Sequence, residues 1–105
     1  DLKCKVIKTN MGWSDDPRSK DYNRPIIIKK NYKYSYESLY RFDSKYDLLI
    51  PIKYNYNRPI KNKGSAIFLH LTNNFKPTAG CIALKKKDFI VMLNLIKNKT
   101  KIKII

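Results

Sequence analysis

The sequence has very few of the side chains on which most catalytic and metal sites depend. It contains one histidine, His70, and two cysteines, Cys4 and Cys81, and it has neither a CxxC nor an HExxH pattern. A structural or catalytic zinc site is therefore not expected. Cys4 and Cys81 could pair in an oxidising compartment, but two distant cysteines do not make a disulfide framework. If Cys81 reacts with a substrate it has to stay free, and Cys4 is then a small hydrophobic residue.

Long apolar runs are also absent. No stretch approaches the roughly 20 residues that a membrane-spanning helix needs. No signal peptide is visible, and the chain begins with Asp1 rather than methionine, so we expect a processed or trimmed start. The chain has 105 residues, of which 43% are hydrophobic. This is enough for one modest core, and we predict a single domain over residues 1–105.

Negative charge is scarce. Eight acidic residues against 23 basic ones give a formal net charge of +15. Such a balance favours a polyanionic partner, which could be nucleic acid, an anionic membrane surface or an acidic cell-wall polymer. The lysines are spread along the whole chain, and the joint abundance of Lys, Ile, Asn and Tyr is what A/T-rich codons produce without selection for binding. Both observations argue against nucleic acid and favour a solvated basic surface.

Hydrophobic periodicity predicts a mainly β chain with one helix in its C-terminal region, a β-rich α+β fold. Alternation of apolar and polar residues predicts strands at residues 2–7, 48–54, 66–71 and 100–105. Pro51 places the second of these at a sheet edge or a bulge. Apolar residues at i, i+3, i+4 and i+7 predict a helix over about 86–97, with Asp88 in its first turn and Lys97 in its last. Residues 11–25 are predicted to form a polar loop, and residues 35–46 have weak helical spacing.

His70 and Cys81 are the residue types that cysteine chemistry needs. A thiolate attacks, a nearby base generates it, and backbone donors stabilise the oxyanion that forms. His70 falls late on a predicted strand, which would fix its ring. Gly80 lets a substrate carbonyl approach the backbone, and the amides of Gly80 and Cys81 could form an oxyanion hole. A lone histidine or cysteine is more often a packed structural residue, so spacing alone leaves both interpretations open.

Four further residues are candidates for substrate binding. Arg24 could bind a substrate carboxylate, or it could simply pair with an aspartate. Trp13 could line a substrate cleft. Asn23 and Thr78 complete this set. Glu37 and Arg41 are spaced i, i+4, so a local surface pair is predicted for them.

Two stretches around the histidine and the cysteine resemble a known signature. Residues 64–70, GSAIFLH, and residues 77–84, PTAGCIAL, resemble the active-site motif of the YkuD-type L,D-transpeptidases, and more closely their ErfK/YbiS/YcfS/YnhG branch. Three upstream pieces resemble the same branch: GWSDDP at 12–17, YNRP at 22–25, and the segment from Ser35-Tyr36-Glu37 through Arg41 to Tyr46-Asp47. The resemblance covers nearly the whole chain.

The resemblance implies a partial YkuD-like catalytic fold that lacks N-terminal strands. It implies Cys81 as nucleophile, His70 as general base oriented by a backbone carbonyl, and an oxyanion held at the backbone of Ala79, Gly80 and Cys81. The implied reaction is acyl transfer on a peptidoglycan stem peptide through a thioester, with release of D-alanine and with no metal or organic cofactor. It also implies a periplasmic or cell-envelope location, where anionic wall polymers are further partners.

The sequence departs from the family pattern at several positions. Family members often carry Ser-His-Gly-Cys with an arginine two residues later, whereas this chain has Thr78-Ala79-Gly80-Cys81 and then Ala83. Ser14 and Tyr36 stand where this branch is expected to have Cys and His. Two alternatives stay open: an L,D-carboxypeptidase or other hydrolase with the same Cys-His pair, and a non-catalytic polyanion-binding module in which both residues are only packed.

Overall fold

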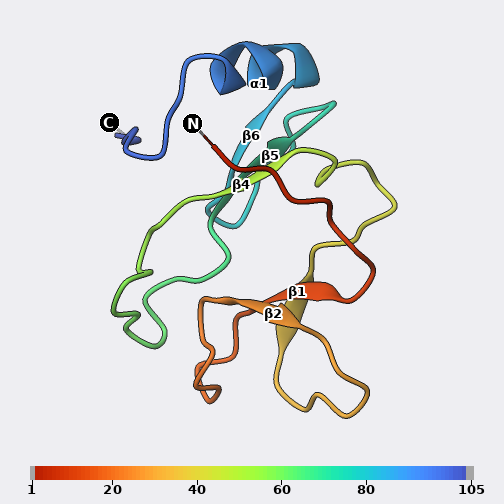
Figure 1. The fold of residues 1–105 in the computed structure, drawn as a ribbon, viewed down its shortest axis with the longest axis vertical. Helices are drawn as coiled ribbons and strands as arrows, with labels where there is room; N and C mark the ends of the chain where they lie inside the picture. The colour runs from red at the N-terminus through yellow and green to blue at the C-terminus, as the bar shows by residue number, and fades with distance from the viewer. Residues whose placement is uncertain (1, 104–105) are drawn as a thin grey trace.

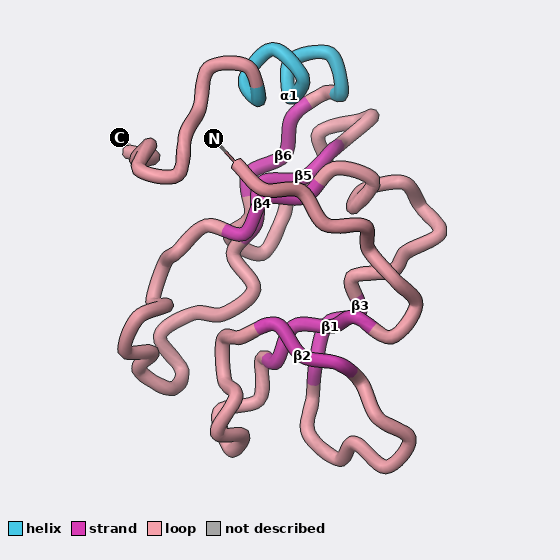
Figure 2. The backbone as a smooth tube through the Cα atoms, in the orientation of Figure 1, coloured by secondary structure: helices cyan, strands magenta, loops and turns pink. Residues whose placement is uncertain are grey.

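Six short strands in two sheets, together with one helix, form the regular structure of the protein (Figures 1 and 2). The computed structural model describes residues 2–103. The elements in chain order are β1 (Met11–Ser14), β2 (Pro25–Ile27), β3 (Tyr36–Ser38), β4 (Leu49–Pro51), β5 (Phe68–Leu71), β6 (Ile82–Leu84) and α1 (Lys86–Leu93). The predicted fold class, mainly β with one helix in the C-terminal region, is confirmed.

The first sheet has the order β2-β1-β3, and both pairings are antiparallel. Its central strand requires a glycine, because a Cβ at Gly12 would lie 2.9 Å from Cδ1 of Ile28 and 3.2 Å from the carbonyl oxygen of Glu37. This sheet corrects two predictions. Residues 11–25 are not one loop, since β1 occupies their start, and residues 36–38 form a strand rather than part of a helix.

The second sheet has the order β4-β5-β6, with β4 antiparallel and β6 parallel to β5. The strand predicted at 66–71 is observed as β5, and the strand predicted at 48–54 is observed as β4 at the sheet edge. Pro51 is tolerated there because an edge strand leaves one side of its backbone unpaired. Strand β6 was not predicted, because its residues, IAL, stand between a glycine turn and a lysine run and show no alternation of apolar and polar side chains.

Strand β5 is the central strand of the second sheet and is buried on both faces. Phe68 is fully buried, and its ring packs edge-on against Trp13 at 5.2 Å between centroids and against Tyr46 at 5.7 Å. On the other face, Leu69 and Leu71 pack against Phe89 of α1. Alternate residues of β5 therefore lie on opposite faces, and each face contributes to a separate hydrophobic cluster.

Helix α1 covers the second sheet through Phe89, which is 1% exposed, with Met92 and Leu93 beside it. The helix was predicted to continue to residue 97 but ends at Leu93. Beyond that point the backbone tightens: the amide of Asn94 donates to the carbonyl of Val91, three residues back, at 3.2 Å. Lys97 consequently lies outside the helix. Within residues 2–103, no helix is long and apolar enough to cross a membrane.

Two predicted terminal strands are wrong in the described range. Residues 2–7 and 100–103 have no strand structure, and residues 104–105 of the predicted last strand lie outside the described residues. Val6, which the alternation assigned to a buried face, is 81% exposed. Alternation fixes only which side chains share a face. A strand also needs a hydrogen-bonding partner, and these segments have none among the described residues.

Replacing Phe68 by alanine should lower the free energy of unfolding by about 3–5 kcal/mol, because it empties a fully buried site between the two sheets. The measurement is urea unfolding followed by circular dichroism. Phe75→Ala is the matched control, since Phe75 is 56% exposed and its loss should cost less than about 0.5 kcal/mol. Equal effects from the two variants would contradict the core described above.

The Asp16 carboxylate organises the loop that follows β1. It accepts hydrogen bonds from the backbone amide and the guanidinium of Arg18 at 2.8–3.0 Å and from the amide of Ser35 at 2.9 Å. These bonds, led by the Arg18 side chain, hold the pKa of Asp16 well below its usual range. The stabilisation from Asp16 is therefore present above the ordinary carboxyl pKa of 3.8 and is lost as the pH falls below it.

We therefore expect Asp16→Asn to lower the Tm at pH 6 and to have a smaller effect at pH 3, where the native carboxylate also loses its advantage. Thermal melts between pH 6 and 3 measure this. Asp21→Asn is the control, because the Asp21 carboxylate forms no ion pair among the described residues. A Tm loss for Asp16→Asn that stays constant across this range would contradict the assignment.

Candidate active site

Cys81 lies half-buried at the end of the exposed loop that leads into β6. Its sulfur accepts a hydrogen bond from the amide of Phe68 at 3.4 Å and donates one to the carbonyl of Ala66 at 3.3 Å. The preceding turn is closed by the hydroxyl of Thr78, which donates to the carbonyl of Cys81 at 2.5 Å. Gly80 has a φ of +105°, a conformation that favours glycine.

Burial raises the pKa of the Cys81 thiol, and the negative charge of Glu37 raises it further, while the Phe68 amide lowers it. The thiol is therefore protonated in the resting protein at neutral pH. Nucleophilic chemistry at this sulfur consequently requires a base that takes the proton as the new bond forms.

His70, the only histidine in the sequence, is the candidate for this base, because it lies on β5 next to β6. It is buried on β5, and its Nδ1 lies 2.9 Å from the carbonyl oxygen of Leu71. A carbonyl oxygen can only accept a hydrogen bond, so Nδ1 carries the proton. In the neutral imidazole Nε2 then has the free lone pair and is able to accept a proton.

The parallel pairing of β5 and β6 brings His70 and Cys81 to the same face of the sheet. The register pairs Leu69 with Ile82 and His70 with Ala83, so Cys81 stands opposite Phe68. Phe68 and His70 are two residues apart and share one face, and paired residues of parallel strands also share a face. Cys81 accordingly packs against the cluster that contains Phe68 and Tyr46. In the resting structure its hydrogen bonds run to the β5 backbone rather than to His70.

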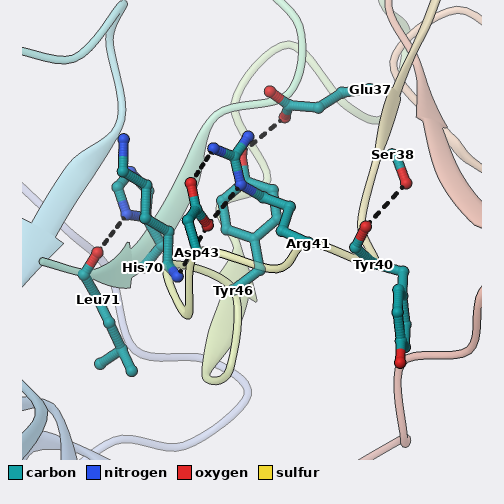
Figure 3. A network of polar contacts seen from close by, with 9 residues as sticks. Glu37, Ser38, Tyr40, Arg41, Asp43, Tyr46, His70 and Leu71 are labelled. Carbon is teal, nitrogen blue, oxygen red and sulfur yellow. Dashed lines mark hydrogen bonds and ion pairs between the residues drawn. The ribbon is translucent and has the colours of Figure 1, made fainter.

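Tyr46 lies beside His70 and is 7% exposed. Its ring lies 5.6 Å from that of His70, and its hydroxyl donates to Glu37 at 2.8 Å (Figure 3). Arg41 forms an ion pair with Asp43. The predicted local Glu37–Arg41 pair is therefore wrong, because residues 36–38 are a strand and the i, i+4 spacing has no helical meaning there.

Trp13 and Asn23 are both buried and have internal partners. The indole of Trp13 donates to Oδ1 of Asn23 at 2.9 Å. Asn23 also donates to the carbonyls of Tyr54 and Asn55 and accepts from the amide of Ala66, so it ties the first sheet to the segment that enters β5. These contacts account for both residues structurally, and their predicted role in substrate binding stays a prediction.

Arg24 does not pair with an aspartate among the described residues. Its guanidinium lies 4.2 Å from the centre of the Tyr56 ring and donates to the carbonyl of Asn23 at 3.1 Å. Its predicted carboxylate contact also stays a prediction.

A cavity of about 1030 Å³ lies on the side of Trp13 and Tyr46, under the N-terminal segment, and neither His70 nor Cys81 lines it. Within residues 2–103 no group of three or more histidine, cysteine or acidic side chains is placed to hold a metal ion.

Comparison with known proteins gives one match. The family model described as YkuD, L,D-transpeptidase catalytic domain, matches residues 6–104. No curated protein and no solved structure matches the chain.

Replacing His70 by glutamine should slow alkylation of Cys81 by iodoacetamide at pH 7 by about tenfold or more, because the protonated thiol loses its base. The difference should shrink as the pH rises towards and beyond the thiol pKa, where hydroxide removes the proton. Both proteins also carry Cys4→Ser, which removes the exposed second thiol. The rate is measured by quenching the reaction at intervals and determining the alkylated fraction by mass spectrometry. An unchanged rate at pH 7 would show that His70 is not the base.

Proposed function

Because the chain belongs to the L,D-transpeptidase catalytic domain family, we propose that it is a peptidoglycan L,D-transpeptidase in which Cys81 is the nucleophile and His70 the general base. The observation that supports this assignment most strongly is that His70 lies on β5 and that Cys81, which directly precedes β6, packs on the same face of the sheet. The paired strands are a rigid support, and Cys81 lies next to the first paired residue of β6, Ile82.

In the first half-reaction the Cys81 sulfur attacks the carbonyl that joins the diamino acid of a stem peptide to its terminal D-alanine. The thiol proton passes to Nε2 of His70 and then to the departing amine. The new carbon–sulfur bond replaces the peptide bond, which leaves a thioester on Cys81 and free D-alanine. The contact of Nδ1 with the Leu71 carbonyl keeps Nε2 unprotonated for this step.

The negative oxygen that forms during the attack needs hydrogen-bond donors close to the sulfur. We assign this role to the backbone amides of Gly80 and Cys81, with Ala79 beside them. The left-handed conformation of Gly80 supports the assignment, because it turns the backbone sharply just before the nucleophile. Among residues 2–103, no group accepts a hydrogen bond from either amide.

In the second half-reaction an amine of another stem peptide attacks the thioester, His70 takes the proton from the amine, and the sulfur leaves as the thiol. Water in place of the amine would give an L,D-carboxypeptidase. The site described above fits both acceptors equally, so transpeptidation is proposed on the family alone. A peptidoglycan substrate implies that the protein works in the periplasm or cell envelope, where its net charge of +15 would favour contact with anionic wall polymers.

Incubation with muropeptides that carry tetrapeptide stems should yield cross-linked dimers and free D-alanine, both detected by mass spectrometry. Cys81→Ser should lower the rate by about 10³-fold or more, because the hydroxyl is not activated by this environment. Cys4→Ser is the matched control and should retain full activity, since Cys4 is exposed.

Release of D-alanine without dimers would identify the carboxypeptidase instead. If neither product forms, and the protein binds wall polymers with an affinity that falls steeply with salt, the binding-module alternative holds.

A further inference from the structure

Tyr46 connects the imidazole of His70 to the first sheet. Its ring contacts His70 at 5.6 Å between centroids and at 62° between planes, and it contacts Phe68 at 5.7 Å and 88°. Tyr46 is 7% exposed, so these contacts are closed to solvent. The Tyr46 ring therefore packs against the His70 ring on the side of β5 where Cys81 also packs.

Glu37 fixes the far end of the Tyr46 side chain. The phenol donates to Oε2 of Glu37 at 2.8 Å, and Glu37 lies on β3, where the register pairs it with Trp13 of β1 (Figure 3). The carboxylate is thus held by the first sheet, and the phenol is held by the carboxylate. Burial, reinforced by the Glu37 charge, raises the pKa of Tyr46, so the hydroxyl keeps the proton that makes this bond.

Arg41 lies over the Tyr46 ring, with its guanidinium carbon 5.0 Å from the ring centre. The guanidinium is held in turn by its ion pair with Asp43 (Figure 3). A cation over the face of an aromatic ring is attracted by the ring electrons. Tyr46 therefore has partners at its hydroxyl and at its ring, and it has little freedom to turn.

Among residues 2–103, the imidazole of His70 makes one hydrogen bond, from Nδ1 to the carbonyl oxygen of Leu71. One hydrogen bond fixes the tautomer but leaves the ring free to rock about that contact, and the direction of the Nε2 lone pair changes as it rocks. A second, rigid contact on the ring removes this freedom. Proton transfer depends steeply on such orientation.

We propose that Tyr46, anchored by Glu37, is a positioning residue that holds the His70 ring in the orientation that takes the Cys81 proton. The inference rests on the proposed function. It adds a requirement for the Tyr46–Glu37 pair, which supplies no proton to the reaction.

The test compares Tyr46→Leu, which removes the ring, with Tyr22→Leu. Tyr22 is also buried, at 4% exposure, but its ring is not paired with that of His70 in the described part of the chain. Each is made in the full chain and assayed on tetrapeptide muropeptides. For Tyr46→Leu we expect kcat to fall about tenfold or more and KM to stay within about twofold, because the role proposed for Tyr46 concerns proton transfer rather than substrate binding. Tyr22→Leu should keep its kcat.

Glu37 supplies a second, milder pair of variants. Glu37→Gln still accepts the phenol hydrogen bond, so it should keep kcat within about threefold, whereas Glu37→Ala loses the anchor and should resemble Tyr46→Leu. Removing the negative charge should also move the pH profile of Cys81 alkylation to lower pH in both variants. If Tyr46→Leu shows no melting transition and is therefore unfolded, the two Glu37 variants test the positioning role instead.

The outcomes separate the two claims. Because His70 is the only histidine in the sequence, its ring signals in an NMR spectrum need no assignment by mutation. A normal kcat and unchanged His70 signals in Tyr46→Leu would overturn the positioning role. A wild-type protein that turns over no muropeptide, but whose His70-dependent alkylation of Cys81 is lost in Tyr46→Leu, would overturn the proposed function and keep the positioning role.

Discussion

The parallel pairing of β5 with β6 is the constraint on which the rest of the structure depends. Strand β5 is buried on both faces, and its two faces belong to separate hydrophobic clusters that hold the first sheet on one side and α1 on the other. The same strand provides His70 and, through its register with β6, fixes where Cys81 lies. Folding and chemistry therefore share one element. A shift of the register by a single residue would turn Cys81 to the opposite face and separate it from the imidazole.

Sequence patterns predicted the parts of the fold whose signals are local. The start of α1, the strand β5 and the edge position of β4 follow from apolar spacing and from Pro51. The first sheet was missed because its strands, MGWS, PII and YES, lie in polar surroundings without an alternating apolar run, whereas β4 and β5 lie within longer apolar segments. The wrong strand at residues 2–7 shows the opposite limit. Its alternation is regular, but pairing is a tertiary property that no local pattern contains.

The residues of the candidate site also differ in how far the sequence predicted them. The histidine and the cysteine could be selected from the sequence because the chain has so few such residues and because the motifs around them resemble one family, which the family match supports. The contacts around these two residues could not be predicted from the sequence. Glu37 was assigned to a local pair with Arg41, whereas it accepts the hydrogen bond of Tyr46 from a neighbouring strand. Trp13 and Asn23 were chosen as candidates for substrate binding, and no local pattern indicates that both are buried between segments far apart in the chain.

The central claim is that His70 activates Cys81 for acyl transfer, and trapping the intermediate tests it most directly. The full chain is mixed with a tetrapeptide stem in the absence of an acceptor amine, quenched in acid and analysed by intact-protein and peptide mass spectrometry. The account predicts a thioester on the peptide that contains Cys81, with the mass of the stem less D-alanine, and far less of it in His70→Gln at the same time. No adduct on Cys81, or equal amounts in both proteins, would contradict it.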